Sequence, residues 1–216
     1  RESYVAMVCS RGVSKIAGSR DTRDCRNHFY AWCVPYVHVI KPEIVASGAT
    51  AIIAEGVTRI ADSSINPMVK IIIGDFTKAI FEAKEKHVET AILTDANGFV
   101  TEGPGFNIFA ITGKTLLTSA HGVLAGITRK TVLEIAEKLQ LKTEIRAISK
   151  AEFLQADEVF ISSSAGGIIP IVQINDRVFA GGVCGKTTKD IHHIYWEWFA
   201  SPKFRTPITY ATSNEA

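Results

Sequence analysis

The sequence predicts a mixed α/β fold, and three observations lead to that class. Short runs rich in Val, Ile, Tyr and Phe alternate with polar turns, as in strands joined by hairpins. Longer segments repeat apolar residues at helical spacing. Few strand–helix–strand units are present, which argues against a doubly wound parallel sheet. The 216 residues are enough for one sizeable domain, or for a large domain with part of a smaller one.

The N-terminal part predicts two strands and a long loop. Residues 4–10 and 29–40 have the composition of strands, and an arginine-rich polar segment lies between them. That segment is either a solvated connection or a mobile flap that brings a cation to an acidic substrate. Both alternatives place it at the surface.

Domain boundaries follow from changes in composition. Lys41-Pro42 and Ser47-Gly48 interrupt the strand pattern, which is typical of a linker. The sequence starts at Arg1, almost directly in a strand, so we expect the N-terminal part of the first domain to be absent from it. The expected parts are the C-terminal part of a small domain at 1–40, a linker at 41–48 and a large domain at 49–216.

The large domain is expected to begin with a strand, a helix and a hairpin. Residues 49–60 have strand character, and Pro67 suits the first turn of a helix. Apolar residues then recur at helical spacing over 70–86. A strand at 91–94 returns at 99–101 through a tight Asp-Ala-Asn-Gly turn.

The centre of the chain predicts a second hairpin followed by a helix. Strands at 106–111 and 114–118 are joined by a turn that contains Gly113. The segment 128–140 is the clearest helix of the chain, because its Val, Ile, Ala and Leu residues form one apolar face. Thr128 is placed as the N-cap of this helix.

The C-terminal part predicts two strands, a hairpin and a final helix. The strands are 144–147 and 158–162, with a short helix at 151–156 between them. A hairpin turn follows at Asn175-Asp176. The last helix, 186–199, carries a cluster of aromatic residues, which indicates a core or an interface rather than a surface that stacks nucleic-acid bases.

Composition excludes several classes of protein. Hydrophobic residues make up 46% and charged residues 21%, as in ordinary globular proteins. The formal net charge is +2 and no basic stripe is present, so no nucleic-acid partner is expected. No apolar run reaches the roughly 20 residues of a membrane span, and the first residues lack the pattern of a signal peptide. We therefore expect a cytoplasmic protein without a membrane segment. The four cysteines lack metal-binding spacing, so no metal is expected and reduced thiols are predicted at Cys9, Cys25, Cys33 and Cys184.

Two segments have the composition of a phosphate site. Gly126-Ile127-Thr128 opens the clearest helix, where backbone N–H groups and the helix dipole favour an anion. Ser163–Gly167 supplies hydroxyls and a bend at which backbone can approach a ligand closely. A capped helix and a polar turn are the structural alternatives. The sequence lacks a P-loop motif, so binding of a nucleoside triphosphate in that manner is not expected.

A lysine and an acid complete a possible cofactor site. Lys70 lies inside an apolar run, and desolvation there would lower its pKa and favour Schiff-base formation. The alternative is a lysine whose charged end reaches solvent at a helix start. Glu102 precedes the bend Gly103-Pro104-Gly105, where it either caps a turn or holds a proton on a ring nitrogen. Pyridoxal phosphate needs a lysine, an acid and a phosphate site, and the sequence offers all three.

These residues resemble the fold-type IV pyridoxal-phosphate enzymes, the family of branched-chain and D-amino-acid aminotransferases. Within that family the sequence is most similar to the fungal (R)-selective amine transaminases. The resemblance covers nearly the whole chain. It implies a partial small N-terminal α/β domain, a larger C-terminal pseudo-barrel α/β domain and a homodimer. The matching segments are INPMVK (65–70), LTDANGFVTEGPGFNIF (93–109), GVLAGITRK (122–130), SSSAGGIIPI (162–171) and GGVCGKTTKDI (181–191).

The resemblance also implies a role for individual residues. The Schiff-base lysine of the family falls on Lys70, and the acid that binds the pyridine nitrogen falls on Glu102. The other implied positions are Leu124, Gly126, Ile127, Thr128 and Ser164 for the cofactor, and Tyr4, Ser163 and Ala165 for the substrate.

The implied reaction is transamination from an amine or amino acid to a keto acid, through a Schiff base at Lys70. A lyase of the same fold, resembling aminodeoxychorismate lyase, and a truncated, catalytically idle homologue are the alternatives. The chain departs from the amine transaminases on the substrate side. Ala6 replaces an acid, Ala17 takes the position of the flap arginine, and one residue, the pocket tryptophan, is absent after Lys70.

Overall fold

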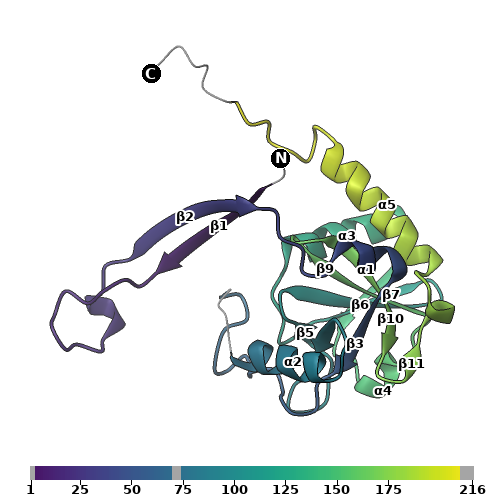
Figure 1. Ribbon diagram of the computed structural model, residues 1–216, viewed down its shortest axis with the longest axis horizontal. Coiled ribbons are helices and arrows are strands. Elements are labelled where there is room, and N and C mark those ends of the chain that lie inside the picture. The colour runs from purple at the N-terminus through teal and green to yellow at the C-terminus, as the bar shows by residue number, and fades with distance from the viewer. Residues whose placement is uncertain (1–2, 70–73, 210–216) are drawn as a thin grey trace. The chain divides into compact units, whose positions relative to one another are not determined.

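The computed structural model describes residues 3–69 and 74–209 (Figure 1). The chain divides into two units, Arg1–His38 and Val39–Ala216. The mixed α/β class expected from the sequence is confirmed. Among the helices in the described ranges, none combines the length and the apolar character that crossing a lipid bilayer requires.

The first unit is a β-hairpin with a long connection. Strand β1 (Ser3–Ser10) pairs antiparallel with β2 (His28–Pro35). Strand β2 ends at Pro35 rather than at the expected residue 40, because proline has no N–H to continue a ladder. The connection contains a 3₁₀ turn, η1 (Thr22–Asp24), whose N-cap Asp21 accepts a hydrogen bond from a backbone N–H. None of the residues in β1 and β2 is buried.

The second unit begins with a helix where the sequence predicted a linker. Helix α1 (Pro42–Ser47) lies within the segment 41–48. Strand β3 (Ala49–Ile53) follows and is shorter than the expected strand at 49–60. The chain leaves the sheet there, because the backbone N–H groups of Glu55 and Gly56 donate to the carboxylate of Glu82 instead of to a strand.

A mixed sheet forms the centre of the second unit. Its further strands are β4 (Thr90–Ile92), β5 (Glu102–Gly103), β6 (Phe106–Thr112), β7 (Thr115–Ser119), β8 (Lys142–Arg146), β9 (Glu158–Ser163), β10 (Gly167–Ile174) and β11 (Arg177–Val178). Within the described residues the sheet has nine strands in the order β4-β3-β10-β9-β6-β7-β8, with β5 beside β6 and β11 beside β10. The β3–β4, β3–β10 and β7–β8 pairs are parallel, and the other pairs are antiparallel.

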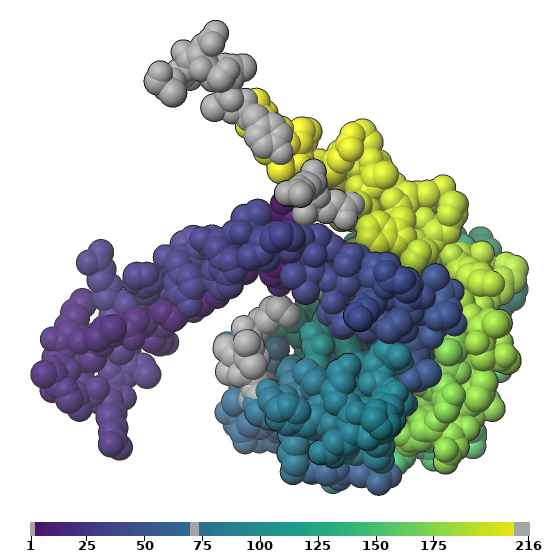
Figure 2. All heavy atoms as spheres, in the orientation of Figure 1, coloured from purple at the N-terminus to yellow at the C-terminus, as the bar shows by residue number. Residues whose placement is uncertain are grey.

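Helices cover the sheet and bury its apolar residues. They are α2 (Gly74–Glu85), α3 (Ile127–Lys138), α4 (Lys150–Phe153) and α5 (Lys186–Ala200), with a 3₁₀ turn η2 (Ala180–Gly182). Helices α3 and α5 pack against each other (Figure 1). They share a core with the stacked rings of Phe109 and Phe160, whose centroids are 4.8 Å apart. Helix α2 packs beside β4. Helix α5, yellow in Figure 2, also forms part of the surface and exposes Phe199.

Most expected elements of this unit are present, with shifted ends. The hairpins at 106–118 and around 175–176 are confirmed. The expected return at 99–101 is not a regular strand, but it does pair back with residues 93–95. Thr94 and Val100 form an antiparallel bridge, the N–H of Asp95 donates to the carbonyl of Phe99, and the N–H of Thr101 donates to the carbonyl of Leu93. Regular strand pairing begins one residue after this segment, at β5, whose two residues pair with β6.

Candidate active site

Glu102 lies on β5 in a position that the backbone defines tightly. Its carbonyl accepts a hydrogen bond of 3.0 Å from the N–H of Leu93. The next residue has to be glycine, because a Cβ on Gly103 would lie 2.2 Å from the ring of Phe106 and 2.5 Å from the carbonyl oxygen of Ala91. The sequence therefore places an acid beside a residue that lets β5 approach its neighbours closely.

The carboxylate of Glu102 is buried and held by several donors. Oε2 accepts hydrogen bonds from the backbone N–H of Leu124 at 2.8 Å and from Nδ2 of Asn107 at 3.1 Å. Oε1 accepts a hydrogen bond from Nη2 of Arg59 at 3.2 Å. Glu102 is only 4% exposed. Neutral and cationic donors together favour the ionised form of a carboxylate.

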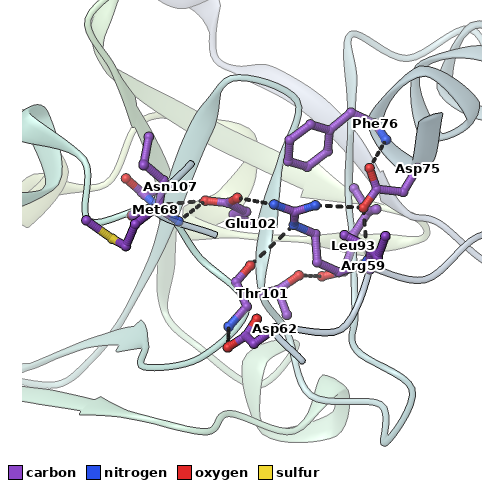
Figure 3. Close-up of polar contacts among 12 residues, drawn as sticks. Arg59, Asp62, Met68, Asp75, Phe76, Leu93, Thr101, Glu102 and Asn107 are labelled. Atoms are coloured by element: carbon purple, nitrogen blue, oxygen red, sulfur yellow. Dashed lines mark hydrogen bonds and ion pairs between the residues drawn. The ribbon is translucent and has the colours of Figure 1, made fainter. Parts of the chain in front are cut away.

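A buried arginine lies between Glu102 and a second carboxylate. Nη1 of Arg59 donates to Oδ2 of Asp75 at 2.7 Å, on the side opposite Glu102 (Figure 3). Nε of Arg59 donates to the carbonyl of Gly122 at 3.3 Å. The guanidinium carbon lies 4.3 Å from the centre of the Phe76 ring. The arginine is therefore fixed by two anions, a carbonyl and an aromatic face.

Asp75 is held as a carboxylate at the start of α2. Burial opposes its ionisation, but hydrogen bonds from the N–H of Ile60, from Arg59 and from the N–H of Phe76 outweigh that effect, and the pKa of Asp75 lies below its ordinary value. The two backbone hydrogen bonds measure 3.0 Å from Ile60 and 2.7 Å from Phe76. Asp75 is thus a fixed negative charge on the far side of Arg59.

Asn107 joins the acid to the segment before α3. Its Nδ2 also donates to the carbonyl of Leu124 at 2.8 Å. A Cβ on Gly126 would lie 2.3 Å from Oδ1 of Asn107, so only glycine permits this approach. The N–H of Gly122, in the same segment, donates to Oδ2 of Asp62 at 3.1 Å.

The start of α3 differs from the prediction. The N-cap is Gly126, not Thr128, and it makes no side-chain hydrogen bond to the first turn. Thr128 lies inside that turn, is buried, and has a side-chain hydrogen bond with Tyr195. Burial raises the pKa of Tyr195, and the bond with Thr128 offsets that rise only in part. A helix start without a side-chain cap leaves first-turn N–H groups available to an anion.

The second candidate phosphate segment follows β9. The hydroxyl of Ser163 donates to the carbonyl of Gly105 at 2.9 Å and accepts from the N–H of Ala165 at 3.2 Å. The carbonyl of Ala165 accepts from the N–H of Val39 at 2.7 Å. Ser164 is exposed in this turn. The turn is therefore tied to the bend that follows Glu102.

Tyr195 connects this turn with the start of α3. Gly167 has φ of +71°, and a Cβ there would lie 2.8 Å from the ring of Tyr195 and 2.9 Å from that of Trp196. Because Tyr195 also bonds Thr128, helix α5 contacts both candidate phosphate segments.

Two buried side-chain atoms among the described residues have no hydrogen-bond partner, Oγ of Ser162 and Nε of Arg129. Ser162 lies directly opposite Asn107 in the β6–β9 pair. Arg129 lies in the first turn of α3, and its Nη2 donates to the carbonyl of Ser119 at 3.0 Å. Burial lowers the pKa of Arg129, against the attraction of Glu102. Buried polar atoms without partners are positions at which a bound water or ligand group is expected.

The structure brings some of the predicted site residues together and leaves others separate. Glu102, Leu124 and Gly126 meet around Asn107. Lys70, the predicted Schiff-base residue, lies outside the described residues. The last predicted residue, Tyr4, is on β1 opposite Val34, in the first unit.

Sequence reasoning missed the residues that hold Glu102. Asn107 had a visible signal, since it is the one polar side chain in the apolar run 106–111. Arg59 had none, because its partners are 16 and 43 residues away along the chain. Asp75 carries no local signal of its role, and Tyr195 is visible in the sequence only as part of the aromatic cluster of the last helix.

A family profile and several relatives match this chain. The profile of the amino-transferase class IV family matches residues 13–174. A putative branched-chain-amino-acid aminotransferase of Methanocaldococcus jannaschii is 29% identical over 195 residues, which are 88% of this chain and 65% of the relative. The branched-chain-amino-acid aminotransferase of Escherichia coli K12 is 31% identical over 120 residues, 55% of this chain and 39% of the relative. The chain thus spans less than two thirds of each of these relatives.

Solved structures match over a larger part of the chain. The branched-chain aminotransferase of Thermoproteus uzoniensis, determined with norvaline, superimposes with a TM-score of 0.81 at 29% identity. That match covers 94% of this chain and 67% of the other. The branched-chain amino acid aminotransferase of T.th., determined with pyridoxamine 5'-phosphate, gives a TM-score of 0.82 at 23% identity, with the same coverage, and so shows the shared fold.

Proposed function

The chain belongs to the class IV aminotransferase family, and we propose that it carries the cofactor site of a pyridoxal-phosphate-dependent transaminase. The reaction moves an amino group from an amine or amino acid to a keto acid. The observation that carries this proposal is the buried carboxylate of Glu102, held by Arg59, Asn107 and the N–H of Leu124. A fixed, buried anion of this kind suits the protonated ring nitrogen of pyridoxal phosphate.

The residues present fit the two ends of this cofactor. Glu102 would bind the ring nitrogen, and the start of α3 at Gly126, which has no side-chain cap, would receive the phosphate. The proposed cofactor-binding residues are Lys70, Glu102, Leu124, Gly126, Ile127, Thr128 and Ser164. When bound, pyridoxal phosphate supplies an electron-withdrawing ring that takes up negative charge from the substrate carbon.

The protein groups have separate tasks in this proposal. Lys70 would hold the cofactor covalently and, once displaced by the substrate amine, would carry a proton to and from the substrate carbon. Glu102 keeps the ring nitrogen protonated. Leu124 is half-buried and its backbone N–H binds the carboxylate of Glu102, and we propose that its side chain packs on the ring. The N–H groups of Ile127 and Thr128 orient the phosphate.

The proposed substrate side lies at the turn that follows β9. Ser163 and Ala165 belong to the turn that contacts the bend after Glu102, and we propose that they face the substrate. For Tyr4, a substrate-binding role is proposed from the family resemblance alone. The relatives are branched-chain aminotransferases, which supports an amino acid and a keto acid as the substrate pair. It also favours transfer over the lyase reaction of the same fold.

The domain organisation, the oligomeric state and the cellular location of the protein are proposed next. We propose that residues 49–216 form the cofactor-binding domain and that residues 1–40 are the C-terminal part of a smaller one. We also propose a homodimer, which the family resemblance implies, located in the cytoplasm. All four cysteines are free thiols, in keeping with a reducing compartment.

Product analysis tests the proposed function. Purified protein is incubated with pyridoxal phosphate, a branched-chain amino acid and 2-ketoglutarate, and both products are followed by NMR. We expect the new amino acid and the new keto acid to form in equal amounts with wild type and with Lys78→Ala, an exposed lysine on α2. Lys70→Ala should form neither. Keto acid limited to one equivalent per site without an acceptor is the first half of the same transfer. Continued release of pyruvate without an acceptor, from an amino acid that carries a leaving group on its β-carbon, would indicate a lyase, and cofactor binding without any product would indicate an idle homologue.

A further inference from the structure

Arg59 forms a buried ion cluster with two carboxylates. The exposed fractions of the side chains are 4% for Arg59, 7% for Asp75 and 5% for Glu102. The charged atoms are 2.7 Å apart on the Asp75 side and 3.2 Å apart on the Glu102 side. A buried cation is costly unless it is paired and hydrogen-bonded, and Arg59 meets both conditions.

The sum of charges in this cluster differs from that of a simple ion pair. Arg59 with Glu102 alone would be neutral, and a neutral pair would attract a cationic ring nitrogen weakly. Asp75 adds a second negative charge, so the three side chains carry one net negative charge. Inside a protein such a charge acts over several ångströms, because screening by solvent is reduced.

The charge of Asp75 is held in place by its own contacts. Its two oxygens accept from the N–H groups of Ile60 and Phe76, and the Phe76 ring lies against the guanidinium of Arg59. Asp75 therefore cannot turn away from Arg59 without losing two backbone hydrogen bonds. The carboxylate is part of a rigid support, not a mobile surface group.

Other charged groups lie around the same carboxylate. Arg129 is attracted by Glu102 from the first turn of α3, although its Nη2 donates to the carbonyl of Ser119. Asp62 accepts from the N–H of Gly122, whose carbonyl binds Arg59. Among the described residues these two side chains have opposite charges, so the net negative charge still depends on Asp75.

We propose that Arg59 and Asp75 are positioning residues that set the charge which Glu102 presents to the ring nitrogen of bound pyridoxal phosphate. Arg59 fixes the carboxylate and Asp75 offsets the charge of Arg59. The inference rests on the proposed function. It adds a role for two residues that do not themselves contact the reacting atoms.

A pair of ligands separates this role from a purely structural one. The probes are pyridoxal phosphate and its analogue in which CH replaces the ring nitrogen. Dissociation constants are measured for both with the full chain. The useful quantity is the preference, defined as the dissociation constant of the analogue divided by that of pyridoxal phosphate. A variant that is partly unfolded or altered in shape binds both ligands more weakly, and this common effect cancels in the ratio of the two dissociation constants.

We expect Asp75→Asn to lower the preference about tenfold, since one pKa unit corresponds to a tenfold change between protonation states. Arg59→Gln should change it in the opposite direction, because it removes the positive charge next to Glu102. Glu82→Gln is the matched control, since Glu82 is a carboxylate on the same helix that also accepts two backbone N–H groups. Its preference should equal that of wild type.

The outcomes are distinct. A preference that Asp75→Asn and Arg59→Gln leave unchanged, or that both change in the same direction, overturns the inference while the proposed function stands. If one of the two variants does not fold, the direction in which the other changes the preference tests the inference: Asp75→Asn has to lower it and Arg59→Gln has to raise it. Wild type that binds neither pyridoxal phosphate nor the analogue would instead overturn the proposed function.

Discussion

The backbone N–H of Leu124 donates to Oε2 of Glu102 over 2.8 Å, although the two residues are 22 positions apart. Asn107 strengthens this connection, because its Nδ2 donates both to Glu102 and to the carbonyl of Leu124. Helix α3 begins three residues after Leu124. The distance between the carboxylate and the helix start is therefore fixed by hydrogen bonds, as binding two ends of one ligand requires.

Asn107→Ala should lower the free energy of unfolding by about 1–3 kcal/mol, because it leaves the partly buried carbonyl of Leu124 and one oxygen of Glu102 without their side-chain donor. Urea denaturation measures this change. Asn97→Ala is the control, since Asn97 is exposed in a turn. Equal stability of the two variants would contradict the role assigned to Asn107.

Glu102→Gln should bind pyridoxal phosphate but lose most of the transamination rate. We expect kcat to fall roughly 100-fold, the usual effect of removing one preorganised polar group at a developing charge. Glu89→Gln is the control, because Glu89 is a partly buried carboxylate that accepts hydrogen bonds from Thr50. Steady-state kinetics with saturating cofactor provide the comparison, and a full rate for Glu102→Gln would show that this acid does not serve the ring nitrogen.

Acid should destabilise the protein partly through Asp75. Because the pKa of Asp75 is lower in the folded state, the unfolded chain binds more protons near pH 4, and stability rises with pH there. The contribution of Asp75 is complete above its ordinary pKa near 3.9 and is lost as pH falls through the lower folded value. Wild type should therefore be more stable than Asp75→Asn at pH 6, and the difference should shrink below about pH 4. Urea titrations at several pH values test this, and a difference that does not change with pH would contradict it.

Gly126→Ala should weaken cofactor binding. The backbone at Gly126 has φ of −63° and ψ of 144°, which any residue can adopt, so strain is not the reason. The added Cβ would instead lie 2.3 Å from Oδ1 of Asn107 and displace either Asn107 or the helix start. Fluorescence titration with pyridoxal phosphate should show weaker binding than for Lys130→Ala, an exposed position one turn later. Equal affinities would show that the site tolerates a larger residue at the cap.

The sequence was sufficient to predict the elements that have local patterns. The helix at α3 has an apolar face in its own residues, and Glu102 lies beside glycines that mark a close approach of the backbone. The N-cap prediction failed because Thr128 lies just after a glycine that caps the helix, and its side chain bonds Tyr195 instead.

The support of the acid could not be predicted in the same way. Arg59 and Asp75 lie at positions where nothing in the neighbouring sequence indicates burial, and their pairing depends on the folding of β5 next to the start of α2. The position of Tyr195 between two candidate phosphate segments likewise depends on the packing of α5. Such long-range contacts leave no periodic signal in a single sequence.

Covalent trapping at Lys70 tests the central claim most directly. The protein is incubated with pyridoxal phosphate, reduced with borohydride and digested, and the modified peptide is located by mass spectrometry. We expect a phosphopyridoxyl group on Lys70 at near-stoichiometric yield in wild type and in the control variant Lys78→Ala. Two results would contradict the cofactor site described for this chain. One is a phosphopyridoxyl group carried mainly by other lysines, and the other is a Lys70→Ala protein that is labelled to the same extent as wild type.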